Sequence, residues 1–227
     1  MARLTGYNKF IFCIVGVGGT GSLLARDLPK LLIGMPHIML LIDGDTVEEK
    51  NMERQSYQEQ DIGEKKAVAL SAKINSFYNT TCYTYNQYLT KNELKVLLKE
   101  KYPDYIPVLI GCVDNDKTRI ILENTFRSFE KVIYLDSANS EYEGNIYVAL
   151  KEHERMEGCL RSEVYQLADD LHPADKSCQE QLAEGNTQFL ITNAKMSIYL
   201  LQHIHYLLND NLKVGVTNVE RFTTAHY

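Results

Sequence analysis

The feature that most constrains the fold is an apolar run that passes directly into a glycine-rich turn. Phe10–Val15 is a continuous stretch of β-branched and aromatic residues, and Gly16–Gly21 (Gly-Val-Gly-Gly-Thr-Gly) follows with no spacer. Ser22–Ile33 has the pattern of a helix, and His37–Asp43 is a second apolar run. A strand buried on both faces, a helix and another such strand make a right-handed βαβ unit of a parallel sheet.

The same alternation continues toward the middle of the chain. Further helices are predicted at Lys66–Phe77, Asn92–Lys101 (capped by Thr90 or Asn92) and Lys117–Phe129, and further strands at Cys82–Tyr85, Pro107–Val113 and Lys131–Asp136. Gly144–Leu150 follows the last of these without an intervening helix, so we expect it to join the sheet antiparallel. The pattern predicts an α/β fold with a Rossmann-like, doubly wound, mostly parallel sheet and antiparallel C-terminal strands.

The C-terminal third is less regular. Residues 151–186 are charged and weakly periodic, and we expect an irregular crossover segment there. Thr187–Leu208 predicts a long helix, and Lys213–Thr223 a terminal strand or hairpin. The predicted apolar stripe of the long helix consists of Leu190, Ala194, Ile198, Leu201 and His205 or Leu208. Without repeats or low-complexity linkers, the 227 residues are expected to form one domain, residues 1–227.

Charge and cysteine content exclude several classes of protein. The formal net charge of -6 argues against nucleic acid or an anionic membrane as the main partner. No apolar run is long enough to span a bilayer, and the start of the chain lacks a signal-peptide pattern, so we expect a cytoplasmic protein. The five cysteines are odd in number and irregularly spaced, which argues against a disulfide scaffold, and the absence of a C-x-x-C pair excludes a four-cysteine zinc site.

The glycine turn lies where a nucleotide-binding loop would be expected. Glycines permit a tight turn and close backbone approach, while the following helix offers unpaired N–H groups to a phosphate. Asp43, at the end of the second strand, can accept hydrogen bonds from ribose hydroxyls. These two features alone fit nicotinamide cofactors as well as ATP, and a glycine turn without a ligand is the alternative.

Charged residues near other strand ends favour a triphosphate. Asp114 follows the Pro107–Val113 strand, at the sheet edge where parallel sheets bind ligands, and a carboxylate there can hold Mg²⁺. Arg54 and Lys66 can neutralise phosphate charge, although surface cations, as one of Lys65 and Lys66 should be, are the alternative. Helix capping is the alternative for Asp114, Asn115 and Asp116, and Arg119 follows them closely.

Four segments together resemble the ThiF/MoeB family, the adenylating fold of ubiquitin-activating enzymes. They are the glycine turn, Asp43–Gln55 (D-G-D-x-V, then N-x-x-R-Q), Asp61–Lys66 (D-I-G-x-x-K) and Asp114-Asn115. The resemblance runs from about Phe10 to Val148 in order and spacing. The series is not a dehydrogenase pattern, and the chain is similar to the compact bacterial form, including ThiF-like proteins of plasmid-associated gene clusters.

The resemblance implies an ATP site and a reaction. Arg54, Lys66 and Asp114 would be catalytic, with Asp114 also binding magnesium. The substrate would be the C-terminal carboxylate of a small ubiquitin-like or sulfur-carrier β-grasp protein ending in glycines, activated as an acyl-adenylate. A homodimer is implied as well. The residues that would bind ATP are Gly16, Gly18, Gly19, Gly21, Asp43, Asp45, Asn51, Arg54, Gln55, Lys66 and Asn115.

The chain departs from the family pattern in three places. The two zinc-binding C-x-x-C pairs of many bacterial relatives are missing, so no zinc is expected. Arg3 is the only candidate for an additional arginine that the family often donates across a dimer. Cys178 lies in the irregular crossover, where some relatives hold a thiol that accepts the activated carboxylate, and Lys176 nearby could lower its pKa. Cys159 is the weaker candidate.

Three other functions stay open at this point. The activated carboxylate could belong to a small molecule, such as a tRNA base modification. An NAD(P)-dependent oxidoreductase would use the glycine turn and Asp43, but it leaves Arg54, Lys66 and Asp114 without roles, and no Tyr-x-x-x-Lys dyad is evident. A non-catalytic scaffold that binds a β-grasp partner would have no need of those three residues together.

Overall fold

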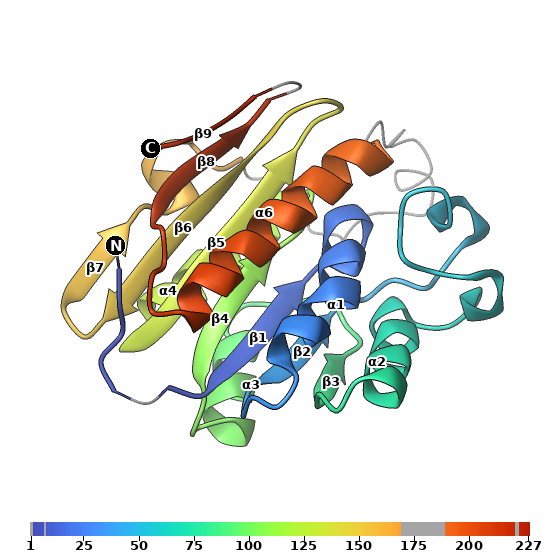
Figure 1. The fold of residues 1–227 in the computed structure, drawn as a ribbon, viewed down its shortest axis with the longest axis horizontal. Helices are drawn as coiled ribbons and strands as arrows, with labels where there is room; N and C mark the ends of the chain where they lie inside the picture. The colour runs from blue at the N-terminus through green and yellow to red at the C-terminus, as the bar shows by residue number, and fades with distance from the viewer. Residues whose placement is uncertain (1, 7, 169–188, 221–222) are drawn as a thin grey trace.

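The computed structural model describes residues 2–6, 8–168, 189–220 and 223–227. Within them, nine strands form one sheet (Figure 1). The strands are β1 (Phe10–Val15), β2 (Ile38–Ile42), β3 (Cys82–Tyr85), β4 (Ile106–Gly111), β5 (Lys131–Asn139), β6 (Gly144–Glu152), β7 (Arg155–Gly158), β8 (Gly215–Val219) and β9 (Thr224–His226).

The sheet has a parallel half and an antiparallel half. Its order is β3-β2-β1-β4-β5-β6-β8-β9, with β7 paired to β6 outside this path. The first five strands in this order are parallel, and β6, β7, β8 and β9 pair antiparallel. This confirms the predicted fold class, including the antiparallel entry of β6. Because the chain leaves β3 and re-enters on the other side of β1, the carboxyl ends of β1 and β4 flank a crevice where such folds bind ligands.

Helices cover both faces of the sheet. The helices are α1 (Gly19–Leu32), α2 (Lys66–Phe77), α3 (Glu93–Lys101), α4 (Asp116–Arg127) and α6 (Leu190–Leu208). Helices α1, α2 and α6 pack with one set of strand residues, among them Phe12 and Ile14. Helices α3 and α4 pack with the alternate set, among them Ile11 and Cys13. Two covered faces explain why the parallel strands are apolar runs without alternation.

The buried face of α6 differs from the predicted stripe. Ile198 is 62% exposed and Leu190 47%, and His205 is also exposed. Met196, Leu200, Ile204 and Leu207 are buried instead, together with polar residues of the same face. Figure 1 shows α6 lying beside α1 across the sheet, so the face that meets α1 and the strands is the buried one.

Smaller differences concern element ends. Helix α1 begins at Gly19, three residues earlier than predicted, which places Gly19 and Gly21 within its first turn. Neither predicted cap of α3 is formed by a side chain; instead Glu93 accepts a hydrogen bond from the Thr90 N–H at 2.8 Å. The expected irregular segment contains the end of β6 and the hairpin strand β7, and its residues 169–186 lie outside the described part.

Candidate active site

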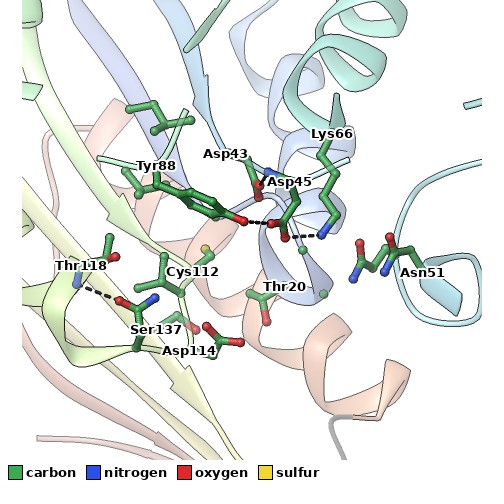
Figure 2. A pocket seen from close by; sticks show the side chains of 18 of the residues that line it. Thr20, Asp43, Asp45, Asn51, Lys66, Tyr88, Cys112, Asp114, Thr118 and Ser137 are labelled. Carbon is green, nitrogen blue, oxygen red and sulfur yellow. Dashed lines mark hydrogen bonds and ion pairs between the residues drawn. The ribbon is translucent and has the colours of Figure 1, made fainter. Parts of the chain in front are cut away.

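A cavity of about 420 Å³ opens at the carboxyl edge of the parallel strands. Its walls come from the glycine turn, the loops after β2, β3 and β4, and the start of α2 (Figure 2). The lining includes almost all of the predicted nucleotide-binding residues: Gly16, Gly18, Gly19, Asp43, Asp45, Asn51, Arg54, Gln55, Lys66, Asp114 and Asn115. The sheet therefore gathers segments up to a hundred residues apart in one volume typical of small-molecule sites.

The glycines serve two different purposes. Gly16 has a φ of +83°, and a Cβ there would lie 2.8 Å from the Cys112 carbonyl oxygen. Gly21 does not line the cavity, and a Cβ on it would collide with the Gly16 carbonyl oxygen. Gly18 is the N-cap of α1, with no side-chain cap and no acid in the first turn. The turn thus lets the uncapped N-terminus of α1 meet the cavity, which favours an anion.

Asp43 joins the β2 loop to the glycine turn. Its Oδ2 accepts from the Val17 N–H and its Oδ1 from the Asp45 N–H, both at 2.8 Å. Burial raises the pKa of Asp43, opposed by the charge of Lys66 and by these backbone donors. Each oxygen retains a second lone pair that can accept from a ligand. The residue predicted to hold ribose is therefore also a fixed part of the loop structure.

Lys66 is the lysine of the pair that enters the cavity. Its Nζ lies 2.8 Å from Asp45 Oδ2, and the residue is only 6% exposed. Lys65 is exposed, and its Nζ donates to the Gly44 carbonyl at 2.5 Å outside the cavity lining. Asp45 also accepts a short hydrogen bond from the Tyr88 hydroxyl (Figure 2). The prediction that one of the two lysines lies on the surface is correct, and that lysine is Lys65.

The polar loop after β2 is held against the glycine turn. Tyr57 donates to the Val17 carbonyl at 2.7 Å, and the Ser56 N–H donates to Ser22 Oγ at 3.0 Å. This places Arg54, which is half-buried, on the cavity wall. Burial lowers the pKa of Arg54, while the nearby charge of Asp114 opposes that shift. Arg54 and Asp114 thus face the same space from separate loops.

The Asp114-Asn115-Asp116 segment divides its tasks. Asn115 caps α4 by accepting from the Thr118 N–H at 2.9 Å, so the capping alternative is correct for it. Asp116 accepts from Arg119 at 2.8 Å, and Arg119 is buried, 3.5 Å from Asp136. Asp114 lines the cavity opposite Asp45 and Lys66 (Figure 2). Of the two carboxylates in this segment, Asp114 is therefore the one that faces the cavity and is available to a ligand.

The donor set fits a nucleotide with a divalent cation. Apart from the Glu48–Lys50 ion pair at 2.7 Å, three carboxylates (Asp43, Asp45, Asp114) and two cations (Arg54, Lys66) line the cavity. A polyphosphate would add negative charge to this balance, so a cation is needed with it. Within the described residues, no three His, Cys, Asp or Glu side chains are grouped so that they could hold a metal ion by themselves. Mg²⁺ needs no such group, because one or two carboxylates, phosphates and waters suffice.

Unpaired buried atoms also indicate a polar ligand. Gln55 and Ser137 line the cavity, and Gln55 Oε1 and Ser137 Oγ are buried without a hydrogen-bond partner within the described residues. Leaving such atoms unpaired costs about 1–3 kcal/mol each, which a ligand or water would offset. Ser137 was not among the predicted residues, nor were Thr20, Cys112, Thr118, Asn139 and the Gln87-Tyr88-Leu89 segment, all of which line the cavity.

Among the remaining candidate residues, neither Arg3 nor Cys159 lines this cavity. Arg3 is exposed and lies 3.9 Å from Asp210, beside the Ala2–Leu212 bridge, and it is not among the residues that line the cavity. The end of the chain that carries it is marked N in Figure 1. Cys178 lies outside the described residues, and so does Lys176. Burial raises the pKa of Cys159, the weaker candidate, which disfavours a thiolate.

Fold and cavity define a Rossmann-like α/β protein with a polar site at its topological switch point. The chain belongs to the ThiF family, whose pattern matches residues 7–224. The ubiquitin-like modifier-activating enzyme 5 of Xenopus laevis is 30% identical over 154 residues, which is 62% of this chain and 37% of that protein. The same enzyme of Dictyostelium discoideum is 30% identical over 138 residues, which is 56% of this chain and 35% of that protein.

Solved structures share the fold. PaaA has a TM-score of 0.70 at 17% identity, over 96% of this chain and 63% of PaaA. A complex of E. coli MccB with MccA-N7isoASN has a TM-score of 0.69 at 18% identity, over 96% of this chain and 64% of MccB. The chain spans little more than a third of the curated relatives it matches. None of the helices in the described ranges is long and apolar enough to cross a bilayer.

Proposed function

We propose that this protein is an ATP-dependent adenylyltransferase. Its substrate is the C-terminal carboxylate of a small ubiquitin-like or sulfur-carrier β-grasp protein ending in glycines. Two features of similar proteins support this proposal. Relatives are named ubiquitin-like modifier-activating enzymes, and E. coli MccB has been solved with ATP and with AMPCPP and MccA. The proposal includes residues 1–227 as one adenylation domain, a homodimer and a cytoplasmic location.

The reaction transfers AMP to the carboxylate. A carboxylate oxygen attacks the α-phosphorus of ATP, the bond from that phosphorus to the bridging oxygen breaks, and pyrophosphate leaves with the electron pair. The products are an acyl-adenylate and pyrophosphate. No proton has to be moved, so the protein acts by positioning and by stabilising charge.

Cavity residues supply those two effects. The first turn of α1, Lys66 and Arg54 would hold phosphate oxygens, and Asp43 would accept from the ribose. Asp114 would hold Mg²⁺, which supplies further charge neutralisation on the phosphates. Gln55 and Asn51 lie on the same wall as Arg54 and would orient the nucleotide.

One observation carries the proposal. Asp114, Arg54, Lys66 and the uncapped N-terminus of α1 border one cavity, although they come from four separate segments. A triphosphate with its cation uses all four, whereas a nicotinamide cofactor leaves Arg54, Lys66 and Asp114 without roles. Retention of the four together also disfavours a scaffold that binds a partner without chemistry.

The test is ATP–pyrophosphate exchange with and without a candidate β-grasp protein ending in glycines. Exchange should require the partner and should fall at least about 100-fold in Asp114→Ala and in Arg54→Ala, the size of the loss for one transition-state donor. The exposed Asp104 on the α3–β4 turn provides a matched control, and Asp104→Ala should retain full exchange. Exchange that persists in a folded Asp114→Ala variant would overturn the proposed role of Asp114.

A further inference from the structure

Asp45 contacts Lys66, the lysine proposed to bind phosphate, through both its backbone and its side chain. The Lys66 N–H donates to the Asp45 carbonyl at 3.0 Å, and Lys66 Nζ lies 2.8 Å from Asp45 Oδ2. Beyond them, Thr46 and Lys65 form an antiparallel bridge, and the Val47 N–H donates to the Glu64 carbonyl at 2.8 Å. The position of the ammonium in the cavity therefore depends on where the Asp45 carboxylate lies.

Asp45 is fixed in turn by the loop after β3. Its Oδ1 accepts the hydroxyl hydrogen of Tyr88, which leaves Oδ2 for Lys66 (Figure 2). The Asp45 N–H also donates to Asp43 Oδ1. The Asp45 carboxylate is therefore fixed at its backbone and connects the Tyr88 hydroxyl to the Lys66 ammonium. Burial raises the pKa of Tyr88, and the hydrogen bond to Asp45 raises it further. Tyr88 thus remains a hydrogen-bond donor at every pH at which the protein would work.

Gly44 makes room for this arrangement. A Cβ on Gly44 would lie 2.8 Å from two carbons of the Tyr88 ring, so the ring rests directly on the glycine backbone. The three residues Asp43, Gly44 and Asp45 therefore have three different roles. Asp43 accepts a hydrogen bond from the glycine turn, Gly44 packs against the Tyr88 ring, and Asp45 forms the ion pair with Lys66.

The charges of this cluster favour the ion pair. Burial by itself would raise the pKa of Asp45, but the charge of Lys66 and the hydrogen bonds from Lys66 and Tyr88 outweigh it and keep that pKa below its usual value. Asp43 and Lys65 are the other charges that act on this pair. Asp45 is therefore ionised and available to hold a lysine whose four-carbon stem is otherwise flexible.

We propose that Tyr88 is a positioning residue for Lys66 and acts through Asp45. This inference rests on the proposed function, in which Lys66 binds the phosphates of ATP. The Tyr88 hydroxyl confines the Asp45 carboxylate, and the confined carboxylate keeps the ammonium where the phosphates arrive. Without the hydroxyl, the ion pair can turn away from the cavity, and part of the binding free energy is spent on ordering it again.

The test measures ATP–Mg²⁺ binding by calorimetry in a double-mutant cycle. Tyr88→Phe keeps the ring on Gly44 and removes only the hydroxyl, and it should weaken ATP binding about tenfold. In an Asp45→Ala background the same substitution should change the dissociation constant less than about twofold, because the connection to Lys66 is already broken. Tyr83→Phe is the matched control, because Tyr83 lies on β3, is 44% exposed and does not line the cavity, and it should leave binding unchanged.

The outcomes separate this inference from the proposed function. Wild-type protein that binds ATP, with Tyr88→Phe binding equally well, would overturn the role of Tyr88 and leave the proposed function intact. Equal losses on Tyr88→Phe in both backgrounds would show that Tyr88 acts on the nucleotide without Asp45, which also overturns the inference. Wild-type protein that does not bind ATP would overturn both.

Discussion

Single residues in this site often have a structural task as well as a task toward a ligand. Asp43 accepts two backbone hydrogen bonds that join the β2 loop to the glycine turn. Asn115 caps α4 and also lines the cavity. Sequence patterns identify such residues because both tasks need the same side chain in the same place. They do not separate the two tasks, and only a substitution that preserves one of them can do so.

The adjacent lysines offer such a comparison. Lys66→Met removes the ammonium that enters the cavity, and we expect ATP–pyrophosphate exchange to fall about 100-fold or more. Lys65→Met removes an exposed ammonium outside the cavity lining and should change exchange less than about threefold. Similar losses of exchange in the two variants would contradict a specific role for the Lys66 ammonium in the cavity. Exchange kinetics with purified protein and its partner give both values.

The glycine turn supplies a second comparison at this scale. A methyl group on Gly21 would collide with the Gly16 carbonyl oxygen, whereas one on Gly18 would meet only Gln55 Nε2 at 3.8 Å. Gly21→Ala should therefore lower the free energy of unfolding by about 2–3 kcal/mol, because packed backbone has to move. Gly18→Ala should cost less, about 0.5–1 kcal/mol, because Gly18 is the N-cap of α1 and alanine is a poorer N-cap than glycine. Urea denaturation measures both, and equal stabilities would contradict the packing role of Gly21.

At the scale of elements, the parallel strands were predictable and the face of α6 was not. Strands covered on both sides leave an unmistakable apolar run, as in Phe10–Val15. Helix α6 buries polar residues that form hydrogen bonds with other elements, and these polar positions hide the period of its buried face. Thr192 donates to the Glu141 carbonyl at 2.6 Å, Asn139 donates to Asn193 at 3.1 Å, and His203 lies 2.9 Å from Thr217. Such partners depend on tertiary contacts, so sequence periodicity selected the wrong stripe.

His203 makes the packing of α6 on the C-terminal strands dependent on pH. Burial lowers the pKa of His203 to about 4, with the nearby His226 adding to the shift. Between this value and about 6.5, the usual pKa of an unfolded histidine, the unfolded chain binds the extra proton and is favoured. Stability should therefore fall by about 2 kcal/mol between pH 7 and pH 5 through this one residue.

Two histidine variants check that dependence. His203→Gln should remove most of this pH-dependent loss, although the variant itself is less stable at pH 7. His205→Gln, an exposed position on the same helix, should keep the wild-type dependence. Denaturation at several pH values gives the comparison, and the idea fails if both variants follow the wild-type slope.

At the scale of the whole molecule, strand order was beyond the reach of sequence patterns. Strand β8 pairs with β6, more than sixty residues earlier in the chain, and the four-residue strand β7 adds only a short hairpin. The same limit applies to the site. The loop after β2 is contiguous and was found from its residues, whereas Tyr88 and Asn139 reach the cavity through the order of the strands. Contiguous motifs are predictable, and contacts made by topology are not.

The N-terminal segment packs against β5 and β6 at the end of the sheet where the parallel strands begin, opposite the end that carries the cavity. Glu152, at the end of β6, accepts from the Thr5 N–H at 3.1 Å and lies 2.9 Å from Lys131 Nζ on β5. The Thr5 hydroxyl and Lys131 lower the pKa of Glu152 from 4.5 to about 2. Because the folded pKa lies below the unfolded one, this contact stabilises the protein fully above about pH 5 and is lost as the pH falls toward 2.

Glu152→Gln should therefore lower the free energy of unfolding by about 1–2 kcal/mol at pH 7. The difference from wild type should shrink steadily below pH 4, since protonation gives the wild-type side chain the same loss of charge. Glu130→Gln is the matched control, because that carboxylate is 84% exposed and pairs only with His153 at 3.4 Å among its salt-bridge partners in the described residues. A Glu152→Gln difference that stays constant from pH 7 to pH 3 would mean that shape, and not charge, connects the N-terminal segment to the sheet.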